Sequence, residues 1–461
     1  MKQLVGVAVL GFVAAALVWQ APASGPDKRL AKAWRSSERA GWIRVHLEGT
    51  PAEIGYQHGY LLAEEIDDLR RVTELQLTHD GKGPYSFFRT TAETILWPRI
   101  EQEYREELQA IAEGARARGS KIDVLDIVVM NATLELGYYI AVLDGKPAPA
   151  ERCTALVATG RYTRDGRVVI GHSNWTGYLD GARWKIIFDV VPSRGHRIFM
   201  DGMPGWIHSG DDFGVNSAGI AITETTITQF IGFDTAGIAE FVRARKAMQY
   251  SSSIDDFVRI MKEGNNGGYA NNWLVADSNT NEVADLELGL KNVNVWRTRD
   301  GYYAGTNFPV SEKLAREETK FDLKDMGLSA NARRVRATEL IENAKGTIDV
   351  PFAKKYLSDH YDSFQKKEDP NERSLCGHID LSPRGLKPWQ DEFGAAGTVQ
   401  AKAADHKLLR DMSFIAAFGH PCGIAFKAAA HLKAHPEFNW QAPLLRDLPS
   451  FPWTQFRMGV R

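Results

Sequence analysis

The sequence predicts an α+β fold in which a mostly helical N-terminal third is followed by strands and helices in alternation. Over much of the first 140 residues, apolar side chains recur at helical spacing. From residue 153 onward, short apolar or alternating runs separated by Gly- and Asp-containing turns predict strands, with helices between them. The polar, Pro-rich stretch 144–152 separates the two regions, so we expect a boundary there.

Composition narrows the class of protein. The chain has 461 residues, and its 56 basic and 58 acidic residues give a net charge of −2. A chain of this length can bury a core without disulfides or a structural metal. The lack of a basic surplus argues against a nucleic-acid partner, whose phosphates require one. The three cysteines are too few for a disulfide scaffold, and an odd number leaves at least one thiol unpaired.

The N-terminus has the pattern of an export signal. Lys2 precedes an uncharged, mostly apolar run over residues 4–19, and small residues follow at Ala21 and Ala23. This pattern predicts a cleaved signal peptide over residues 1–23. The alternative is an anchor formed by residues 4–19, but a helix of that length rises only about 24 Å, against about 30 Å for the hydrocarbon core. We therefore expect export to a periplasm, the exterior or a lysosome-like lumen, with no stable membrane span after signal removal.

Residues 24–152 are expected to form a helical N-terminal fragment. An alternating strand at 43–48 leads into a helix whose start is marked by a capping box of Thr50 and Glu53. Pro51 occupies the first helical position, where its missing N–H costs nothing. The expected helices span residues 51–71, 95–118 and 124–142.

The second region, 153–461, begins at a cysteine. Residues 153–159 predict a strand, Asp165-Gly166 signals a hairpin, and 168–170 is the expected return strand. Further strands are expected at 185–191, 197–200, 219–225, 272–276, 282–288 and 293–297, and helices at 238–249, at 253–261 and from about 331.

Cys153 is the candidate nucleophile. A cysteine at the first position of a strand is either a small buried apolar residue or a nucleophile that is exposed when the Arg152–Cys153 bond is cut. An N-terminal cysteine has its own base, because an α-amino group with a pKa of about 7.7–8.0 is partly neutral near pH 7 and can accept the thiol proton. The cut would leave 153–461 as the catalytic fragment.

Eight short strings follow Cys153 in a fixed order. They are Cys153–Val157, His172–Trp175, Ser209–Phe213, Thr223–Thr226, Tyr269–Trp273, Thr306–Pro309, Asn331–Arg333 and His378–Pro383. Together they resemble the phospholipase B-like family of N-terminal-nucleophile (Ntn) hydrolases, which is related to the acyl-coenzyme A:6-aminopenicillanic acid acyltransferase. The similarity covers most of residues 150–460, and 49–59 also resembles the opening of the acyltransferase relatives.

The resemblance implies an αββα four-layer sandwich with Cys153 at the edge of one sheet and an autocatalytic cut before it. The site residues of the family correspond here to His172, Trp175, Thr226, Asn307 and Arg333. Neither a metal nor an organic cofactor is implied, because one residue supplies both nucleophile and base.

The side-chain chemistry of Asn271 and Arg333 suggests a role for each residue, in addition to what the resemblance implies. The side-chain N–H groups of Asn271 could donate to a developing oxyanion. The rigid fork of donors on Arg333 could hold a carboxylate or orient the Cys153 amine.

The expected hairpin gives one geometric prediction. A tight turn at Asp165-Gly166 would pair Cys153 with Tyr178 and bring Asn174 and Trp175 close to the thiol. The same register would place His172 about 20 Å along the strand. Asn174 and Trp175, rather than His172, are therefore the expected near neighbours.

The two remaining cysteines are rivals or structural residues. Cys376 and Cys422 each lie within two residues of a histidine in the sequence, so either could be a nucleophilic thiol. In an exported protein a Cys376–Cys422 disulfide is the simpler interpretation, and two unbonded thiols is the next.

The sequence thus predicts an enzyme that cleaves an acyl bond of a small-molecule or lipid substrate through an acyl-enzyme on Cys153. The bond is an amide or, as the family name suggests, a phospholipid ester. Two alternatives stay open, namely an acyltransferase that passes the acyl group to an amine, and a binding protein with an inactive site. The sequence specifies neither the acyl chain, the leaving group nor the oligomeric state.

Overall fold

The computed structural model describes residues 27–79, 83–148, 152–210, 213–386 and 390–459. The predicted signal peptide (1–23) and the alternative anchor (4–19) lie outside the described residues, as do residues 149–151 of the Pro-rich stretch.

Two β-sheets form the centre of the molecule. The larger has nine strands in the order β1-β2-β5-β6-β7-β8-β9-β10-β11, and all neighbours are antiparallel except β2 and β5. Its strands are β1 (Trp34–Arg35), β2 (Ile43–Gly49), β5 (Ile186–Pro192), β6 (Ile198–Gly202), β7 (Gly214–Asn216), β8 (Ile220–Thr226), β9 (Asn271–Asp277), β10 (Glu282–Leu288) and β11 (Val293–Thr298).

The smaller sheet has six antiparallel strands in the order β12-β3-β4-β15-β16-β17. They are β12 (Gly301–Gly305), β3 (Arg152–Thr159), β4 (Val169–Gly177), β15 (Ala396–Asp405), β16 (Ser413–Phe418) and β17 (Thr454–Arg457). A short separate hairpin consists of β13 (Tyr361–Asp362) and β14 (Lys367–Glu368).

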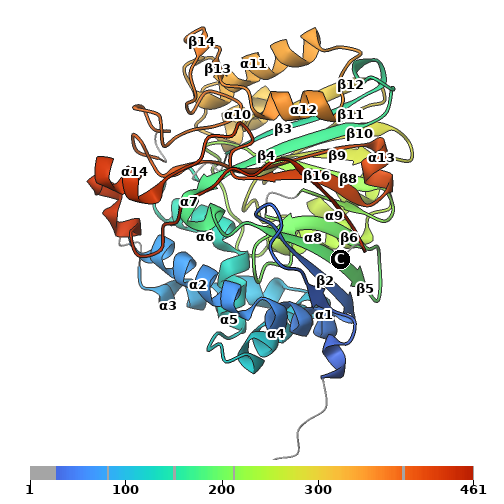
Figure 1. Ribbon diagram of the computed structural model, residues 1–461, viewed down its shortest axis with the longest axis vertical. Helices are drawn as coiled ribbons and strands as arrows, with labels where there is room; N and C mark the ends of the chain where they lie inside the picture. Colours follow the sequence, from blue (N-terminus) through green and yellow to red (C-terminus); the bar gives the residue numbers. More distant parts are fainter. Residues whose placement is uncertain (1–26, 80–82, 149–151, 211–212, 387–389, 460–461) are drawn as a thin grey trace, which may run out of the picture.

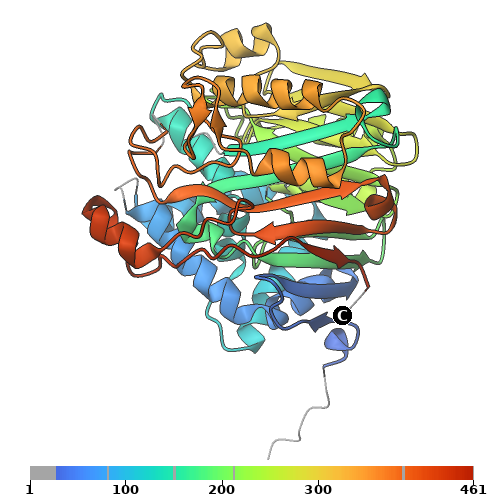
Figure 2. The same ribbon diagram turned by 45° about the horizontal axis from the view of Figure 1, so that its top comes forward.

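Helices cover the outer faces of both sheets (Figure 1). Those on the side of the larger sheet are α1 (Pro51–Leu61), α2 (Ala63–Thr78), α3 (Tyr85–Thr91), α4 (Gln102–Ala117), α5 (Val124–Asn131), α6 (Thr133–Leu143), α8 (Glu240–Tyr250) and α9 (Ile254–Lys262). The smaller sheet is covered by α11 (Ser329–Asn343) and α12 (Val350–Leu357), which Figure 2 shows in orange across its strands. Shorter helices are α7 (Tyr178–Gly181), α10 (Glu312–Glu318), α13 (His406–Arg410) and α14 (Ala428–Ala434). Single turns of other helix types are η1 (Lys28–Leu30), η2 (Ala92–Leu96), η3 (Trp97–Arg99), η4 (Gly160–Tyr162) and η5 (Pro436–Gln441).

Three apolar cores separate these four layers. The core between the two sheets contains Val157 of β3 and Leu274 of β9. The next residue of β3, Leu156, points the other way and packs with α12. The third core joins helices such as α4, through Ile111, to the larger sheet, through Phe188. Because each sheet buries one face on the other and one on helices, the αββα fold predicted from the sequence is confirmed.

The predicted start of the first helix is confirmed, but the helix expected over 51–71 is two helices. Thr50 Oγ1 accepts a hydrogen bond from Glu53 N at 3.3 Å, and the Glu53 carboxylate accepts one from Thr50 N at 2.8 Å. The expected helix over 51–71 divides at Leu62 into α1 and α2, and the one over 124–142 divides at Ala132 into α5 and α6. Helices on both sides of each break face the same core, so apolar spacing alone does not reveal the bend.

The predicted N-terminal fragment is built into the larger sheet. β2 pairs in parallel with β5, from Ile43 opposite Ile186 to Gly49 opposite Pro192. β1 adds to the edge of β2. Residues before Cys153 therefore provide two strands of a sheet whose other strands all follow Cys153.

One helix pair among the described residues has the length and composition of a membrane span. None of their helices is by itself long and apolar enough to cross a bilayer, and only α5 and α6 taken together reach that length and composition, with a 74° bend between them.

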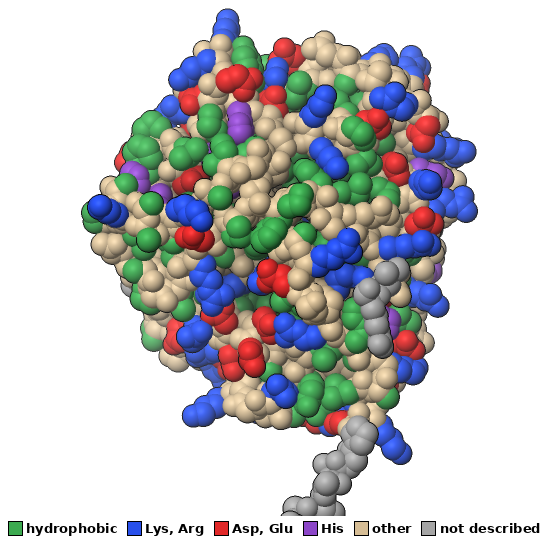
Figure 3. Space-filling model, in the orientation of Figure 1, with side chains coloured by type: hydrophobic (Ala, Val, Ile, Leu, Met, Phe, Trp, Pro, Cys, Tyr) green, Lys and Arg blue, Asp and Glu red, His purple; other side chains and the backbone are tan. Residues whose placement is uncertain are grey.

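On the face shown in Figure 3, basic and acidic side chains are mixed rather than gathered by sign.

Glycines allow α1 and α4 to pack backbone against backbone. A Cβ atom on Gly59 would lie 1.9 Å from the carbonyl oxygen of Ile111, and one on Gly55 would lie 2.1 Å from that of Glu107. Both obstacles are backbone atoms, which cannot rotate away. Only glycine fits this helix crossing.

We expect Gly59→Ala to lower the free energy of unfolding by about 3 kcal/mol, because the methyl group forces the two helices apart. The measurement is the urea midpoint at unchanged m-value. The control is Gln109→Ala on the exposed side of α4, which should stay within about 0.5 kcal/mol of the parent. Equal midpoints for Gly59→Ala and the parent would contradict this packing.

Candidate active site

Cys153 lies near the start of β3 with only 1% of its surface exposed. Its partner on β4 is Asn174, and His172 lies opposite Ala155. The predicted pairing with Tyr178 is wrong, because the connection between β3 and β4 spans residues 160–168 and contains η4 instead of a tight turn. His172 is therefore on the same side of the sheet as the thiol and close to it, not about 20 Å away.

The Cys153 thiol faces a histidine and a carboxylate. Its Sγ, a ring nitrogen of His172 and a carboxylate oxygen of Glu224 all lie within 4.8 Å of one another. The thiol donates to Glu224 Oε1 at 3.7 Å, and the Tyr269 hydroxyl donates to the same oxygen at 2.8 Å. All four side chains are buried. The arrangement can take a proton from the thiol.

The main chain of Cys153 is held at both ends. Its N–H donates to Asn307 Oδ1 at 2.9 Å, and its carbonyl oxygen accepts from Arg333 Nη1 at 2.7 Å. Arg333 Nη2 also donates to Asn307 Oδ1 at 2.9 Å, and Asn307 Nδ2 donates to the carbonyl oxygen of Thr226 at 3.0 Å. The atom that would become the α-amine after a cut thus already has an oriented acceptor.

Trp175 supports Arg333 and does not face the thiol. It lies opposite Arg152 in the β3–β4 pairing, one position from Cys153, so its side chain is on the other face of the sheet. The guanidinium of Arg333 lies 4.4 Å from the centre of the Trp175 ring. This corrects the expectation that Trp175 is a near neighbour of the thiol. Burial lowers the pKa of Arg333, and the charge of Cys153 opposes that shift.

Three buried polar side chains offer hydrogen-bonding capacity beside this group. Thr226 and Asn271 form a cross-strand pair between β8 and β9, and Asn174 lies opposite Cys153. Among the described residues, no partner is found for Thr226 Oγ1, for Asn174 Nδ2 or for either amide atom of Asn271. Buried polar atoms are costly unless something binds them, so these atoms are candidates for contact with a substrate.

A buried ion pair lies behind His172. Lys402 of β15 is directly opposite His172, and its Nζ is 3.1 Å from Asp201 Oδ2. Gln400, opposite Asn174, donates to the same carboxylate oxygen at 2.6 Å, and Ser209 Oγ donates to Asp201 Oδ1 at 2.9 Å. Lys402 and Asp201 are fully buried. The pair places a positive charge on the strand next to His172.

The site contains residues that the sequence analysis did not single out. Glu224, Tyr269 and Ser209 lie within the strings given above, but nothing in their spacing assigns a role to them. Asp201 has no local signal because it is a single charge in a short, otherwise uncharged strand, and nothing in the spacing of the polar residues of β15 assigns a role to Lys402.

The predicted Cys376–Cys422 disulfide is wrong, because both thiols are unbonded. The two sulfur atoms instead lie beside one imidazole nitrogen, His378 Nε2, at 3.6 Å and 3.5 Å respectively. Burial raises the pKa of Cys376, whereas its thiol and then His360 and His378 lower the pKa of Cys422. The shifts thus run in opposite directions, upward for the pKa of Cys376 and downward for that of Cys422.

Comparison with known proteins supports the resemblance seen in the sequence. Residues 89–295 match the family model of Phospholipase B. Curated relatives are an uncharacterized protein of Archaeoglobus fulgidus (28% identical, covering 54% of this chain and 43% of the relative), putative phospholipase B-like 1 of Caenorhabditis elegans (24%; 65% and 57%) and the 40 kDa form of acyl-coenzyme A:6-aminopenicillanic-acid-acyltransferase of Emericella nidulans (24%; 53% and 63%).

The chain thus spans about half the length of the curated relatives it matches. Among solved structures, a variant of conjugated bile acid hydrolase from Clostridium perfringens aligns at 14% identity and a TM-score of 0.35, covering 58% of this chain and 89% of that one. The predicted resemblance to phospholipase B-like proteins and to the acyltransferase is confirmed.

Proposed function

We propose that this chain is an exported Ntn hydrolase that cuts itself before Cys153 and then cleaves acyl bonds, amides above all, through an acyl-enzyme on the Cys153 thiol. One observation carries the proposal. The nitrogen that the cut would convert to an amine is already bound by Asn307 Oδ1, while the thiol of the same residue faces Glu224 and His172. Relatives in the phospholipase B and acyltransferase families support an acyl substrate.

The cut begins from the buried thiol. Glu224 Oε1, at 3.7 Å, accepts the Sγ proton, and the thiolate attacks the carbonyl carbon of Arg152. The Arg152–Cys153 C–N bond breaks as the nitrogen gains a proton, which leaves a thioester between the Arg152 acyl group and Sγ. Water then hydrolyses the thioester, restores the thiol and leaves Arg152 with a carboxylate.

In turnover the new α-amine replaces Glu224 as the base. An unperturbed α-amino group has a pKa of about 7.7–8.0, so it can accept a thiol proton near neutral pH. Asn307 keeps the amine in position, and Arg333 fixes the carbonyl end of the same residue. The thiolate attacks the acyl carbon, the amine protonates the leaving group, and water releases the acid.

Oxyanion stabilisation is assigned to side-chain amides. Asn174 Nδ2 and Asn271 Nδ2 are buried and find no acceptor among the described residues. Preorganised neutral donors of this kind stabilise charge that develops only in the transition state. Because β3 holds Arg152 in the sheet and the thiol is 1% exposed, we infer that the cut must release the residues before Cys153 before a substrate can reach Sγ.

Mass spectrometry of the denatured protein tests the proposal. We expect two polypeptides, one of residues 153–461 and one that ends at Arg152, and the mass of the latter shows whether the signal over 1–23 was removed. The protein is then incubated with a panel of acyl amides and lysophospholipids and quenched in acid. The 153–461 fragment should gain the mass of one acyl group.

The same experiment separates the alternatives. Transfer of the trapped acyl group to an added amine, faster than to water, would establish an acyltransferase, an activity favoured by the similarity to the Emericella nidulans protein. An uncut chain with full turnover would contradict the Ntn mechanism. A chain that neither cuts nor takes up acyl groups would contradict both the hydrolase and the acyltransferase.

A further inference from the structure

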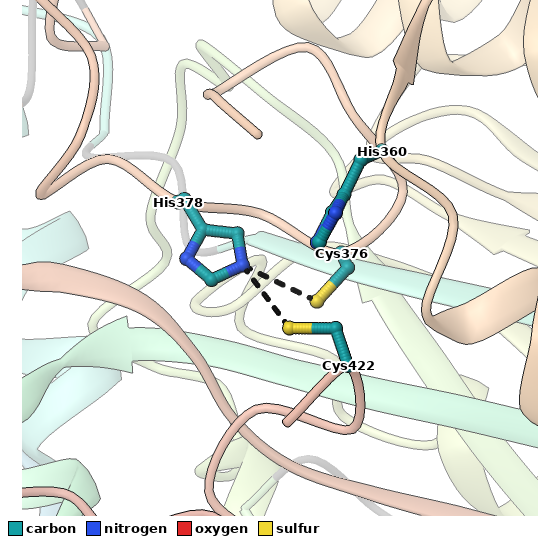
Figure 4. A group of neighbouring side chains, drawn as sticks. All are labelled: His360, Cys376, His378 and Cys422. Carbon is teal, nitrogen blue, oxygen red and sulfur yellow. Dashed lines mark hydrogen bonds between the residues drawn. The ribbon is translucent and has the colours of Figure 1, made fainter. Parts of the chain in front are cut away.

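A second cluster of reactive side chains lies apart from the thiol of Cys153. His360, Cys376, His378 and Cys422 each offer one ligand atom, and the four atoms all lie within 4.8 Å of one another. Figure 4 shows the two sulfur atoms and the two imidazole rings converging on one point. His360 precedes β13, Cys376 and His378 lie between β14 and β15, and Cys422 follows β16.

We propose that these four residues form a structural zinc site, with two thiolates and two imidazoles as ligands. In tetrahedral zinc sites the Zn–S distance is about 2.3 Å and the Zn–N distance about 2.0–2.1 Å, which separates a ligand sulfur from a ligand nitrogen by about 3.6 Å. His378 Nε2 lies 3.6 Å from Cys376 Sγ and 3.5 Å from Cys422 Sγ. Both separations equal an edge of the zinc tetrahedron.

The hydrogen bonds within the cluster do not give each of its ring nitrogen and sulfur atoms a partner of its own. His360 Nε2 is buried, and no hydrogen-bond partner is found for it among the described residues. His378 presents the single atom Nε2 to two sulfur atoms. One cation at the centre would bind all four atoms. Thiolate and imidazole together select zinc over magnesium or calcium, which prefer oxygen ligands.

Neighbouring side chains hold His378 in this orientation. Its Nδ1 lies 3.8 Å from Asp380 Oδ1, and the same oxygen accepts from the Tyr178 hydroxyl at 2.9 Å. The His420 ring stacks on the His378 ring with 4.2 Å between centroids and 15° between planes. His420 Nε2 is in turn 2.9 Å from the Tyr178 hydroxyl. At 3.8 Å the carboxylate does not hydrogen-bond to His378 Nδ1, so the stacked His420 ring is the contact that orients the His378 ring.

The position of the cluster indicates a supporting role. Four protein ligands close the coordination sphere, which is typical of structural zinc and leaves no position for a reacting water. The carbonyl oxygen of Leu375 accepts from Thr154 Oγ1 at 2.8 Å, and a Cβ on Gly377 would lie 2.3 Å from the Trp175 ring. The ion would thus fix the segment that packs against the strand of Cys153 and against the ring under Arg333.

Metal analysis of the reduced protein tests the site and is independent of the acyl chemistry. We expect about one zinc ion per chain. After removal by a chelator, titration with Co²⁺ alone should give the visible bands of tetrahedral cobalt and a thiolate-to-cobalt charge-transfer band, saturating at one equivalent. Adding Zn²⁺ should abolish these bands and raise the melting temperature of the apoprotein, because an ion that binds only the folded chain stabilises it.

Variants identify the ligands. Cys422→Ser and His360→Gln, at half-buried positions, should lose the charge-transfer band or shift it, and should weaken Zn²⁺ binding at least tenfold, since even outer-sphere partners change zinc affinity by about 10–100-fold. Cys153→Ala, the matched control, should keep the cobalt spectrum. No cobalt band in the reduced parent protein, an unaltered spectrum in Cys422→Ser, or loss of the band in Cys153→Ala would each overturn the proposal.

Discussion

Replacement of Cys153 by alanine is expected to yield a single uncut polypeptide with no measurable acyl-bond cleavage. The variant lacks the atom that attacks the Arg152 carbonyl and the atom that carries the acyl group, so both reactions fail together. Removing a catalytic nucleophile lowers kcat by about 10⁶ in well-studied hydrolases, and we expect at least about 10⁴ here. Denatured mass and initial rates on the best substrate of the acyl panel provide the two measurements.

Cys153→Ser is the matched variant. It keeps an attacking atom at the same position, but a hydroxyl is a weaker nucleophile than a thiol. We expect slow cutting over hours and turnover well below that of the parent. Because the side chain is buried and the replacements differ little in size, uncut Cys153→Ala and uncut Cys153→Ser should melt within a few degrees of each other. A Cys153→Ala chain that still divides into two polypeptides would assign the cut to another group.

Removal of the Asn307 amide is expected to lower kcat by about 10²–10³ with little change in KM. Asn307 Oδ1 is the acceptor for Cys153 N, and without it the amine that serves as base is no longer oriented toward the thiol. Small losses of position at a reacting group cost about 100-fold. Rates are normalised to the fraction of chains with Cys153 at the N-terminus, measured by mass, so that slow cutting is not counted as slow turnover.

The backbone at Asn307 determines which substitution is informative. Its φ is +70°, a conformation that glycine adopts without strain and alanine does not. Asn307→Gly therefore removes the amide alone. Asn307→Asp keeps the acceptor oxygen but loses the donor to Thr226 O, so its loss in kcat should be smaller. A parent-like kcat in Asn307→Gly would show that the hydrogen bond to Cys153 has no part in turnover.

Local signals in the sequence predicted local structure well. The capping box of Thr50 and Glu53 and the proline between them marked the start of α1 because all the interactions of a helix start lie within four residues. The predicted register between β3 and β4 was wrong because it does not depend on local interactions alone. The pairing of β3 with β4 depends on the length of the connection, and η4 with the residues after it shifted Cys153 from Tyr178 to Asn174.

The same distinction between local and long-range signals separates the site residues that the sequence identifies from those that it does not. Cys153 was found from its place after a Pro-rich stretch, and the resemblance supplied Asn307 and Arg333, which contact it. Glu224 was missed because only the stacking of one sheet on the other brings it to the thiol, and Lys402 was missed because the pairing of β15 with β4 brings it opposite His172 from far away in the sequence. A buried charge within a strand has no periodicity that reveals a partner far away in the sequence.

The cluster of His360, Cys376, His378 and Cys422 also could not be recognised from the sequence. Spacing patterns for zinc rely on pairs of close ligands, and here only Cys376 and His378 are close in sequence. His360 and Cys422 join them from separate loops. The export signal favours a disulfide, whereas the structure places an imidazole beside both sulfur atoms.

The parallel pairing of β2 with β5 has a consequence for the cut protein. Once the bond before Cys153 is broken, the larger sheet is shared between two polypeptides that only non-covalent contacts hold together. The mature molecule would then behave as a heterodimer, whose melting temperature rises with protein concentration by mass action. Heating would separate two chains that must meet again to refold, so an enzyme that assembled as one chain would lose its activity irreversibly.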